Sequence, residues 1–328
     1  MKFLDYITIN PKILLKKGKI YPFIEMSSVG TSTRQPEVIG FKEFGSGAKF
    51  QDGDTVIARI TPCLQNGKKF YCKNINKGFG STEYMVFRPK DESVDSVFLY
   101  YFMQTEFIKK NMINSMTGAT GRQRVNVDVF NDLEVKIPPI DKQKNIGEIL
   151  STYDDLIENN QKQIKLLEEV AERLYKEWFV DFRFPGHENI KFVDEIPKGW
   201  YKILLEDIAT FKRGKTITKA QVKTGEVPVV AGGMEPAYYH NKANTTSPVV
   251  TISASGANAG FSRLYNEPVF ASDCSFIDNN TTPYLFYVYC FLQDNKAKLR
   301  SLQKGSAQPH VYAKDINMLT IMKPEETI

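Results

Sequence analysis

The chain has 328 residues, of which 42% are hydrophobic and 25% are charged, and its formal net charge is +5. This length gives a prior of two domains, and the composition excludes a disordered or collagen-like chain. The longest apolar run, residues 284–292, is too short for a membrane-spanning helix, which needs about 20 residues. Because residues 1–5 do not begin a signal peptide either, we expect a cytoplasmic protein without membrane contact.

The first part of the chain has the pattern of a β-rich unit. An aromatic-rich run over 97–112 predicts a helix with Phe107 among the side chains on its buried face. A loop containing glycine follows at 116–124, called here the first post-helix loop, and a short strand then leads to two prolines. Strands are predicted upstream of the helix at 55–60, 69–72 and 84–88.

The segment after the two prolines has the clearest periodicity in the chain. Ten residues, called here the seam, recur at alternating spacings of four and three, which is typical of a coiled-coil helix about 50 Å long. The seam consists of Ile146, Leu150, Tyr153, Ile157, Asn160, Ile164, Leu167, Ala171, Leu174 and Trp178. Such a helix packs either on its own globular domain or on a partner helix. We favour a partner helix, because globular helices rarely keep this period for so long.

The last part of the chain repeats the pattern of the first. A shift of 186 residues aligns Phe98 with Tyr284, Val125 with Val311 and Pro138 with Pro324. Strands are predicted at 227–231, 249–253 and 275–278, a helix at 284–300, and a second post-helix loop at 303–310. The chain is therefore expected to contain two copies of one unit, and it stops where a second long helix would begin.

Signatures of catalysis are missing from this sequence. Neither the phosphate-binding G-x-x-x-x-G-K-[ST] pattern nor the dinucleotide-binding G-x-G-x-x-G pattern occurs. The four cysteines lack C-x-x-C spacing and the three histidines are far apart, which disfavours a structural metal site or a His-based catalytic centre. We therefore expect a non-enzymatic chain with no metal or cofactor of its own.

Residue types that are suited to binding nucleic acid recur at matched places in the two copies. Lys and Arg hold phosphates, while Arg, Asn and Gln read base edges. Residues 141–177 carry six Lys or Arg and nine Asp or Glu, so this segment is net −3 and the remainder net +8. The candidate DNA contacts are Arg59, Lys68, Lys69, Arg122, Gln123, Arg124, Lys212, Arg213, Lys215, Asn258, Arg263, Lys304, Gln308 and His310.

Several stretches of the sequence resemble the specificity subunit of type I restriction–modification systems. The run IPPIDKQKNI at 137–146 precedes the heptads, as in that family. The stretch IPKGW at 196–200 resembles the family's domain entry. The stretch QPHVYAKDI at 308–316 resembles the family's domain exit, and GATGR at 118–122 resembles that exit in the first copy. The sequence departs from the family pattern in two ways. A second conserved helix is absent after Ile328, and the first copy lacks an Ile-Pro-x-x-Trp entry.

The resemblance implies an α+β fold with two β-rich target-recognition domains, the first followed by a long coiled-coil-type helix that spaces them. The expected bounds are 1–140 for the first domain, 141–185 for the helical spacer and 186–326 for the second domain. Each domain would read one half of a bipartite double-stranded DNA site. The seam would bind a helix, in cis or in trans, and dock methyltransferase subunits. Those subunits would carry S-adenosylmethionine, and a restriction/translocase subunit would use ATP and Mg.

Two other functions stay open from the sequence. A truncated or split specificity protein would act mainly as a competitor for the methyltransferase, without reading DNA. A nuclease with an unrecognised site would cleave DNA alone in a metal-dependent way. A mimic of DNA is disfavoured, because the chain is basic.

Overall fold

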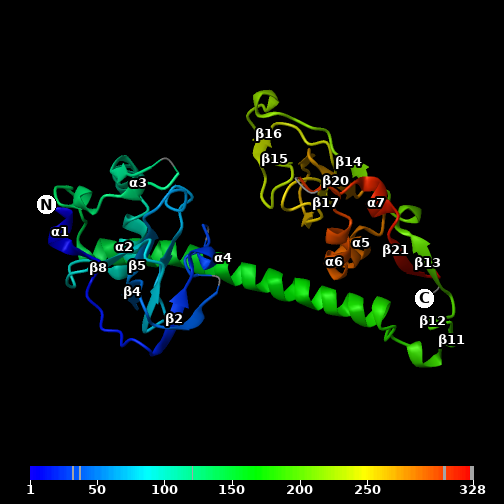
Figure 1. Ribbon diagram of the computed structural model, residues 1–328, viewed down its shortest axis with the longest axis horizontal. Helices are drawn as coiled ribbons and strands as arrows, with labels where there is room; N and C mark the ends of the chain where they lie inside the picture. The colour runs from blue at the N-terminus through cyan, green and yellow to red at the C-terminus, as the bar shows by residue number, and fades with distance from the viewer. Residues whose placement is uncertain (32, 37, 120, 306–307, 326–328) are drawn as a thin grey trace. The chain divides into compact units, whose positions relative to one another are not determined.

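The structure is a computed structural model that describes residues 1–31, 33–36, 38–119, 121–305 and 308–325. The chain divides into two compact units, Met1–Ile164 and Lys165–Ile328, called here unit 1 and unit 2. The long helix α4 (Ile140–Tyr175) contributes residues to both (Figure 1). The domain bounds expected from the sequence, 1–140, 141–185 and 186–326, remain predictions, and the last of these residues, Glu326, lies outside the described part.

Unit 1 contains two four-stranded sheets. The first has the antiparallel order β1 (Ile7–Ile9), β8 (Tyr84–Pro89), β5 (Thr55–Ala58) and β6 (Lys69–Tyr71). The second has the order β3 (Gly40–Glu43), β2 (Ile20–Ile24), β7 (Lys77–Gly80) and β4 (Ala48–Gln51). The sequence reading missed the second sheet, because Pro22 lies inside β2 and its strands are short and partly exposed.

The central strand β5 is buried on both faces and divides the core of unit 1. Val56 faces the cluster between the two sheets, where the Phe50 and Phe70 rings lie edge to face. Ile57 faces the cluster formed with α2 (Ser96–Phe102) and α3 (Glu106–Asn114). This alternation follows from the two-residue period of a strand.

Unit 2 repeats the first sheet of unit 1. Its main sheet has the order β14 (Lys212–Arg213), β20 (Cys274–Asp278), β17 (Val249–Ser253) and β18 (Ser262–Tyr265). A second sheet has the order β16 (Tyr238–His240), β15 (Val227–Val230) and β19 (Phe270–Ala271). A strand pair, β13 (Trp200–Leu204) and β21 (Thr320–Pro324), completes the unit. The matching strand orders confirm two copies of one β-rich unit.

The aromatic helices differ from the expectation. Each predicted single helix is a pair: α2 and α3 in unit 1, and α5 (Leu285–Asp294) and α6 (Lys296–Ser301) in unit 2. A new helix begins in unit 1 after Thr105, and its buried face carries Ile108 and Met112 four residues apart. The burial predicted for Phe107 is wrong, because this side chain lies on the opposite face and is 51% exposed.

Helix α4 contacts unit 1 through a polar face. The buried Gln143 side chain accepts a hydrogen bond from the Asp95 N–H at 2.9 Å and donates to the Ser93 carbonyl oxygen at 2.8 Å. Further along, Asp155 forms an ion pair with the buried Arg34, and the Tyr101 hydroxyl donates to Asp154 at 2.6 Å. Polar contacts of this kind orient the helix without using its apolar residues.

The far end of α4 packs into unit 2 through aromatic rings. Tyr175 is buried in the core of that unit, and its ring stacks on Phe179 at a centroid distance of 5.4 Å. Phe179 lies in a turn of π-helix, Lys176–Val180, and also contacts Trp200. The long helix expected from the seam is thus confirmed, and it extends from Ile140 to the π-turn.

One buried ion pair allows a stability prediction for unit 1. Arg88 Nε and Nη2 donate to the fully buried Asp54 carboxylate at 2.6 and 2.7 Å. Replacing Arg88 with Met leaves this carboxylate unpaired, so we expect the free energy of unfolding to fall by about 3–5 kcal/mol, measured by urea denaturation. Lys90→Met, at an exposed position nearby, should change it by less than about 0.5 kcal/mol. Equal effects of the two substitutions would contradict this assignment.

Among the described residues, no helix is both long and apolar enough to cross a membrane. The same residues contain no group of three His, Cys, Asp or Glu side chains placed to hold a metal ion. All four cysteines are free thiols, and burial raises the pKa of Cys274 to about 12.

Candidate nucleic-acid interface

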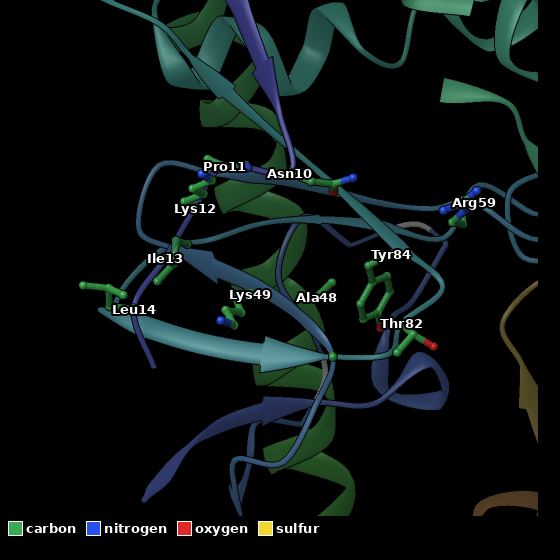
Figure 2. Close-up of a pocket in the computed structure, with 11 residues that line it drawn as sticks. Asn10, Pro11, Lys12, Ile13, Leu14, Ala48, Lys49, Arg59, Thr82 and Tyr84 are labelled. Atoms are coloured by element: carbon green, nitrogen blue, oxygen red, sulfur yellow. The ribbon is translucent and has the colours of Figure 1, made fainter. Parts of the chain in front are cut away.

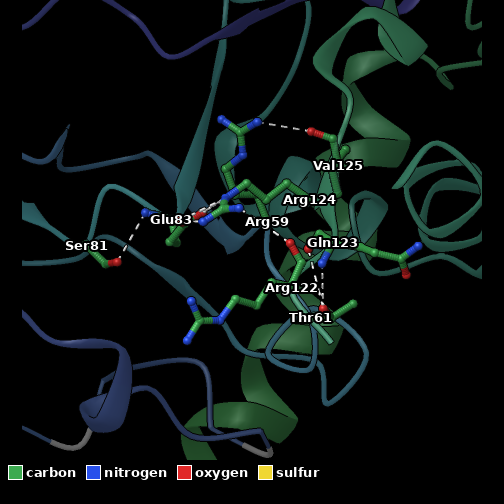
Figure 3. A network of polar contacts seen from close by, with 8 residues as sticks. All are labelled: Arg59, Thr61, Ser81, Glu83, Arg122, Gln123, Arg124 and Val125. Carbon is green, nitrogen blue, oxygen red and sulfur yellow. Dashed lines mark hydrogen bonds and ion pairs between the residues drawn. The ribbon is translucent and has the colours of Figure 1, made fainter. Parts of the chain in front are cut away.

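The first post-helix loop returns beside the end of β5. Thr61 and Gln123 exchange two hydrogen bonds: the Thr61 N–H donates to the Gln123 carbonyl at 2.9 Å, and the Gln123 N–H donates to Thr61 Oγ1 at 3.0 Å (Figure 3). The Val125 N–H then donates to the Arg59 carbonyl at 2.9 Å. This pairing places Arg122, Gln123 and Arg59 at one end of the first sheet of unit 1, which corresponds to the main sheet of unit 2. Thr120, within the loop, lies outside the described residues.

The second post-helix loop is held in the same way in unit 2. The Gly256 N–H donates to the Pro309 carbonyl at 3.0 Å, and the Val311 N–H donates to the Ala254 carbonyl at 3.0 Å. Ser255 and His310 form an isolated β-bridge, as Ile60 and Arg124 do in unit 1. The two loops therefore occupy equivalent places, as the 186-residue repeat predicts. Ser306 and Ala307 lie outside the described residues.

A carboxylate beside each loop binds an arginine. In unit 1, the Glu83 carboxylate accepts hydrogen bonds from Arg124 Nε at 3.0 Å and Nη2 at 2.6 Å, which raises the pKa of Arg124 (Figure 3). In unit 2, Asp273 pairs with Arg213 and also accepts from the Ser255 hydroxyl. The two acids are structurally equivalent. The Glu83 carbonyl accepts a hydrogen bond from the N–H of Arg59, the residue after β5, and the Asp273 carbonyl accepts one from the N–H of Ala254, the residue after β17.

Sequence reasoning missed these two carboxylates. Nothing in the sequence singles out Glu83 or Asp273, since each is a lone acid in a short connection between strands. Their equivalence rests on the register of the sheets: Ala58 pairs with Tyr84 in unit 1, and Ser253 pairs with Cys274 in unit 2. A structural alignment of the two copies is the signal that finds them.

Half of the predicted site residues have side chains already bound within their own unit. Besides Arg124 and Arg213, this group includes Lys304, which pairs with Asp315 at 2.8 Å. Lys69 is half-buried, and burial lowers its pKa. The remaining bonds join Arg59 to the Val125 carbonyl, Lys68 to the Met26 carbonyl, Lys69 to the Gly67 carbonyl and Arg263 to the Met234 carbonyl.

The other half form no side-chain hydrogen bond or ion pair with any described residue. These are Arg122, Gln123, Lys212, Lys215, Asn258, Gln308 and His310. His310 stacks on the Tyr312 ring at a centroid distance of 6.0 Å. Asn258 lines a cavity of about 540 Å³. Lys296 and Arg300 line the same cavity, and the sequence analysis did not select these two residues. Lys68 and Lys69 lie on the β5–β6 hairpin, and the described residues show no polar contact between them and the first post-helix loop.

The part of the seam that lies on α4 is exposed to solvent, whereas Trp178, in the π-turn after α4, is half-buried. The large apolar residues of the seam from Ile146 to Leu174 are each at least 39% exposed, and Leu167 is 68% exposed. Ile149, Leu156 and Val170 widen the apolar row and were missed by the strict four-three spacing. Soluble proteins rarely expose a continuous apolar row of this length, so this face is a candidate docking surface. Its occupant remains a prediction.

The chain is similar to known proteins in its sequence. The sequence matches the family described as "Type I restriction modification DNA specificity domain" over residues 7–169 and 197–327. It is 32% identical over 148 residues to the type I restriction enzyme MjaIX specificity subunit of Methanocaldococcus jannaschii, covering 43% of this chain and 34% of that protein. It is 25% identical over 263 residues to the putative MjaX specificity subunit of the same organism, covering 73% and 60%.

The fold is similar to that of a solved structure. The crystal structure of the type I restriction–modification system S subunit from M. genitalium matches with a TM-score of 0.56 and 16% sequence identity. That match covers 98% of this chain and 83% of the other, and at this identity it concerns the fold alone. Of the two curated relatives, the chain spans 34% and 60% of their own lengths.

Proposed function

Because this chain belongs to the family of type I restriction–modification DNA specificity domains, we propose that it recognises a bipartite DNA sequence, with one half read by each unit. The observation that carries this proposal is the repeated loop. In both units a post-helix loop is fastened by the same backbone hydrogen bonds at the end of the main sheet. The side chains of Arg122 and Gln123 in one loop, and of Gln308 and His310 in the other, form no hydrogen bond or ion pair with a described residue.

Those side chains suit the major groove of double-stranded DNA. Arginine donates two hydrogen bonds to the O6 and N7 atoms of guanine, and glutamine exchanges two with adenine. Lys212 and Lys215, on and after the edge strand β14, suit the phosphates that fix the register of the protein on the duplex. Arg124 and Arg213 are already held by carboxylates, so we assign them mainly to positioning.

The seam completes the proposal as an assembly surface. We assign it to a helix in cis or in trans and to methyltransferase subunits, which would bring S-adenosylmethionine. A restriction/translocase subunit would bring ATP and Mg. In this assignment the chain is a non-catalytic recognition subunit with no cofactor of its own, in keeping with the missing catalytic motifs.

The experiment is selection of DNA by the full chain assembled with methyltransferase subunits. We expect duplexes retained from a random pool to share two short specific groups separated by a spacer of free sequence. Replacing both Gln308 and His310 with Ala should relax only one group, because these residues belong to unit 2 alone.

Other outcomes would overturn the proposal in favour of a stated alternative. Assembly with the methyltransferase but no enrichment of any sequence at low salt would favour the competitor. Metal-dependent cleavage of DNA by the chain alone would favour a nuclease.

A further inference from the structure

Unit 1 has a cavity of about 580 Å³ that reaches Arg59, the residue after β5 (Figure 2). Lys12, Ile13 and Leu14 line one side, on the segment that leaves β1. Lys49 on β4 faces them, and Tyr84 and Arg59 complete the lining. In Figure 2, Leu14 lies at one end of this row and Arg59 at the other. The sequence reading selected Arg59 but neither lysine.

The lining carries positive charge that its own unit does not neutralise. It includes Lys12, Lys49 and Arg59 and no carboxylate. Neither lysine forms an ion pair with a described residue, and Lys49 Nζ lies 5.1 Å from the centre of the Phe44 ring. Arg59 Nε and the hydroxyl of Tyr84, a residue 2% exposed, are buried atoms without a hydrogen-bond partner among the described residues. Because both of these atoms are buried, the positive charge that an anion can reach is carried by Lys12, which is exposed, and Lys49, which is half-buried.

The same cavity has an apolar side. Leu14 is 91% exposed at the rim, while Ile13 is buried beneath it. A small inorganic anion would contact the cationic groups and leave these carbons uncovered. An anion that also carries a carbon face fits better, and a phosphodiester with its deoxyribose is such a group.

Arg59 joins this cavity to the post-helix loop. Its carbonyl accepts from the Val125 N–H at 2.9 Å, and its Nη2 donates to the Val125 carbonyl at 3.2 Å. One DNA strand can therefore contact the cavity and the loop together. In unit 2, β14 pairs with β20 as β1 pairs with β8, and Lys212 and Lys215 occupy the corresponding edge. Both units thus carry a lysine on or after the equivalent edge strand, β1 in unit 1 and β14 in unit 2.

We propose that this cavity is a backbone-anchoring site, in which Lys12 and Lys49 bind a DNA phosphodiester and Leu14 contacts its deoxyribose. The inference rests on the proposed function, which it deepens by separating backbone contacts from base contacts. Phosphate contacts position a protein on DNA but carry no sequence information. The site should therefore set the strength and salt dependence of binding, and leave the recognised sequence unchanged.

The test is a salt titration of DNA binding by the full chain with its methyltransferase subunits. Each phosphate contact contributes about −0.9 to the slope of log Kobs against log salt concentration. Because both lysines bind one phosphodiester, Lys12→Ala/Lys49→Ala should make the slope shallower by about 0.9. The change should be equal on a duplex selected by the wild type and on a scrambled duplex. Selection from a random pool should return the wild-type sequence.

The matched control removes two lysines from the far ends of strands in the same unit. Lys73 follows β6 and Lys90 follows β8, both exposed and away from the cavity. Lys73→Ala/Lys90→Ala should keep the wild-type slope. An unchanged slope in the cavity variant, with sequence-specific binding intact in the wild type, would overturn the anchoring site alone. Absence of any salt-dependent duplex binding by the wild type would overturn both this inference and the proposed function.

Discussion

Replacing Leu167 with Asp is expected to abolish co-purification of the chain with the methyltransferase subunits proposed as its partner. Leu167 lies in the middle of the seam and is 68% exposed, so a partner helix would bury it. An unpaired carboxylate in such an interface costs several kcal/mol, because burial removes its hydration. Both units should stay folded, since their cores do not include this side chain. The measurement is affinity capture of the tagged chain, with thermal unfolding as the check on folding.

Leu166 provides a matched control for this experiment. It neighbours Leu167, is 61% exposed and is not one of the ten seam residues. The same substitution there, Leu166→Asp, should leave co-purification intact. Loss of the partner with both variants would mean that charge on the helix, and not the seam, decides assembly. Retention with Leu167→Asp and also with Leu174→Asp would remove the seam as the docking surface.

The second large effect is expected at Arg122. Replacing it with Ala should cost about 1–3 kcal/mol at one position of the recognised sequence, because a base-reading arginine contributes this much discrimination. Only the half of the site read by unit 1 should change. Competition binding with duplexes altered one base pair at a time measures both the size of the effect and its location. A uniform loss across all sequences would make Arg122 a phosphate contact.

Arg124 should behave differently from Arg122, although it lies only two residues away. Sequence reasoning assigns both to DNA, and we still expect Arg124→Ala to weaken binding. Because Glu83 already holds the Arg124 guanidinium, the effect of Arg124→Ala and that of Glu83→Gln should not add in a double-mutant cycle. Additive effects would mean that Arg124 contacts DNA independently of this pair.

The sequence predicted most of the architecture correctly. The seam located the long helix, because a heptad repeat survives wherever the apolar face must stay on one side of a helix. The 186-residue repeat located the second unit, and the buried strands such as β5 were visible as apolar runs. Thr105 and Asn295, where the aromatic helices break, were missed because the apolar pattern continues across both breaks.

The candidate site was less accessible to sequence reasoning. Basic residues near glycines were easy to select, but the sequence does not say which of them are already paired. Glu83 lies 41 residues from Arg124, and Lys12, on the segment after β1, comes from a different part of the chain than Lys49 on β4. Such neighbours depend on sheet register, which long-range pairing decides and local composition does not encode. The structure therefore divides the predicted contacts into groups that are already bound and groups that are available.

The paired carboxylates also limit how the two modules can be recombined. In unit 1, the guanidinium that pairs with Glu83 belongs to Arg124 in the post-helix loop. In unit 2, the guanidinium that pairs with Asp273 belongs to Arg213 on an edge strand. A chimera with residues 116–124 grafted into unit 2 would place two guanidinium groups against the single carboxylate of Asp273. One of them would be displaced, so a graft that keeps its loop conformation has to exchange Arg213 at the same time.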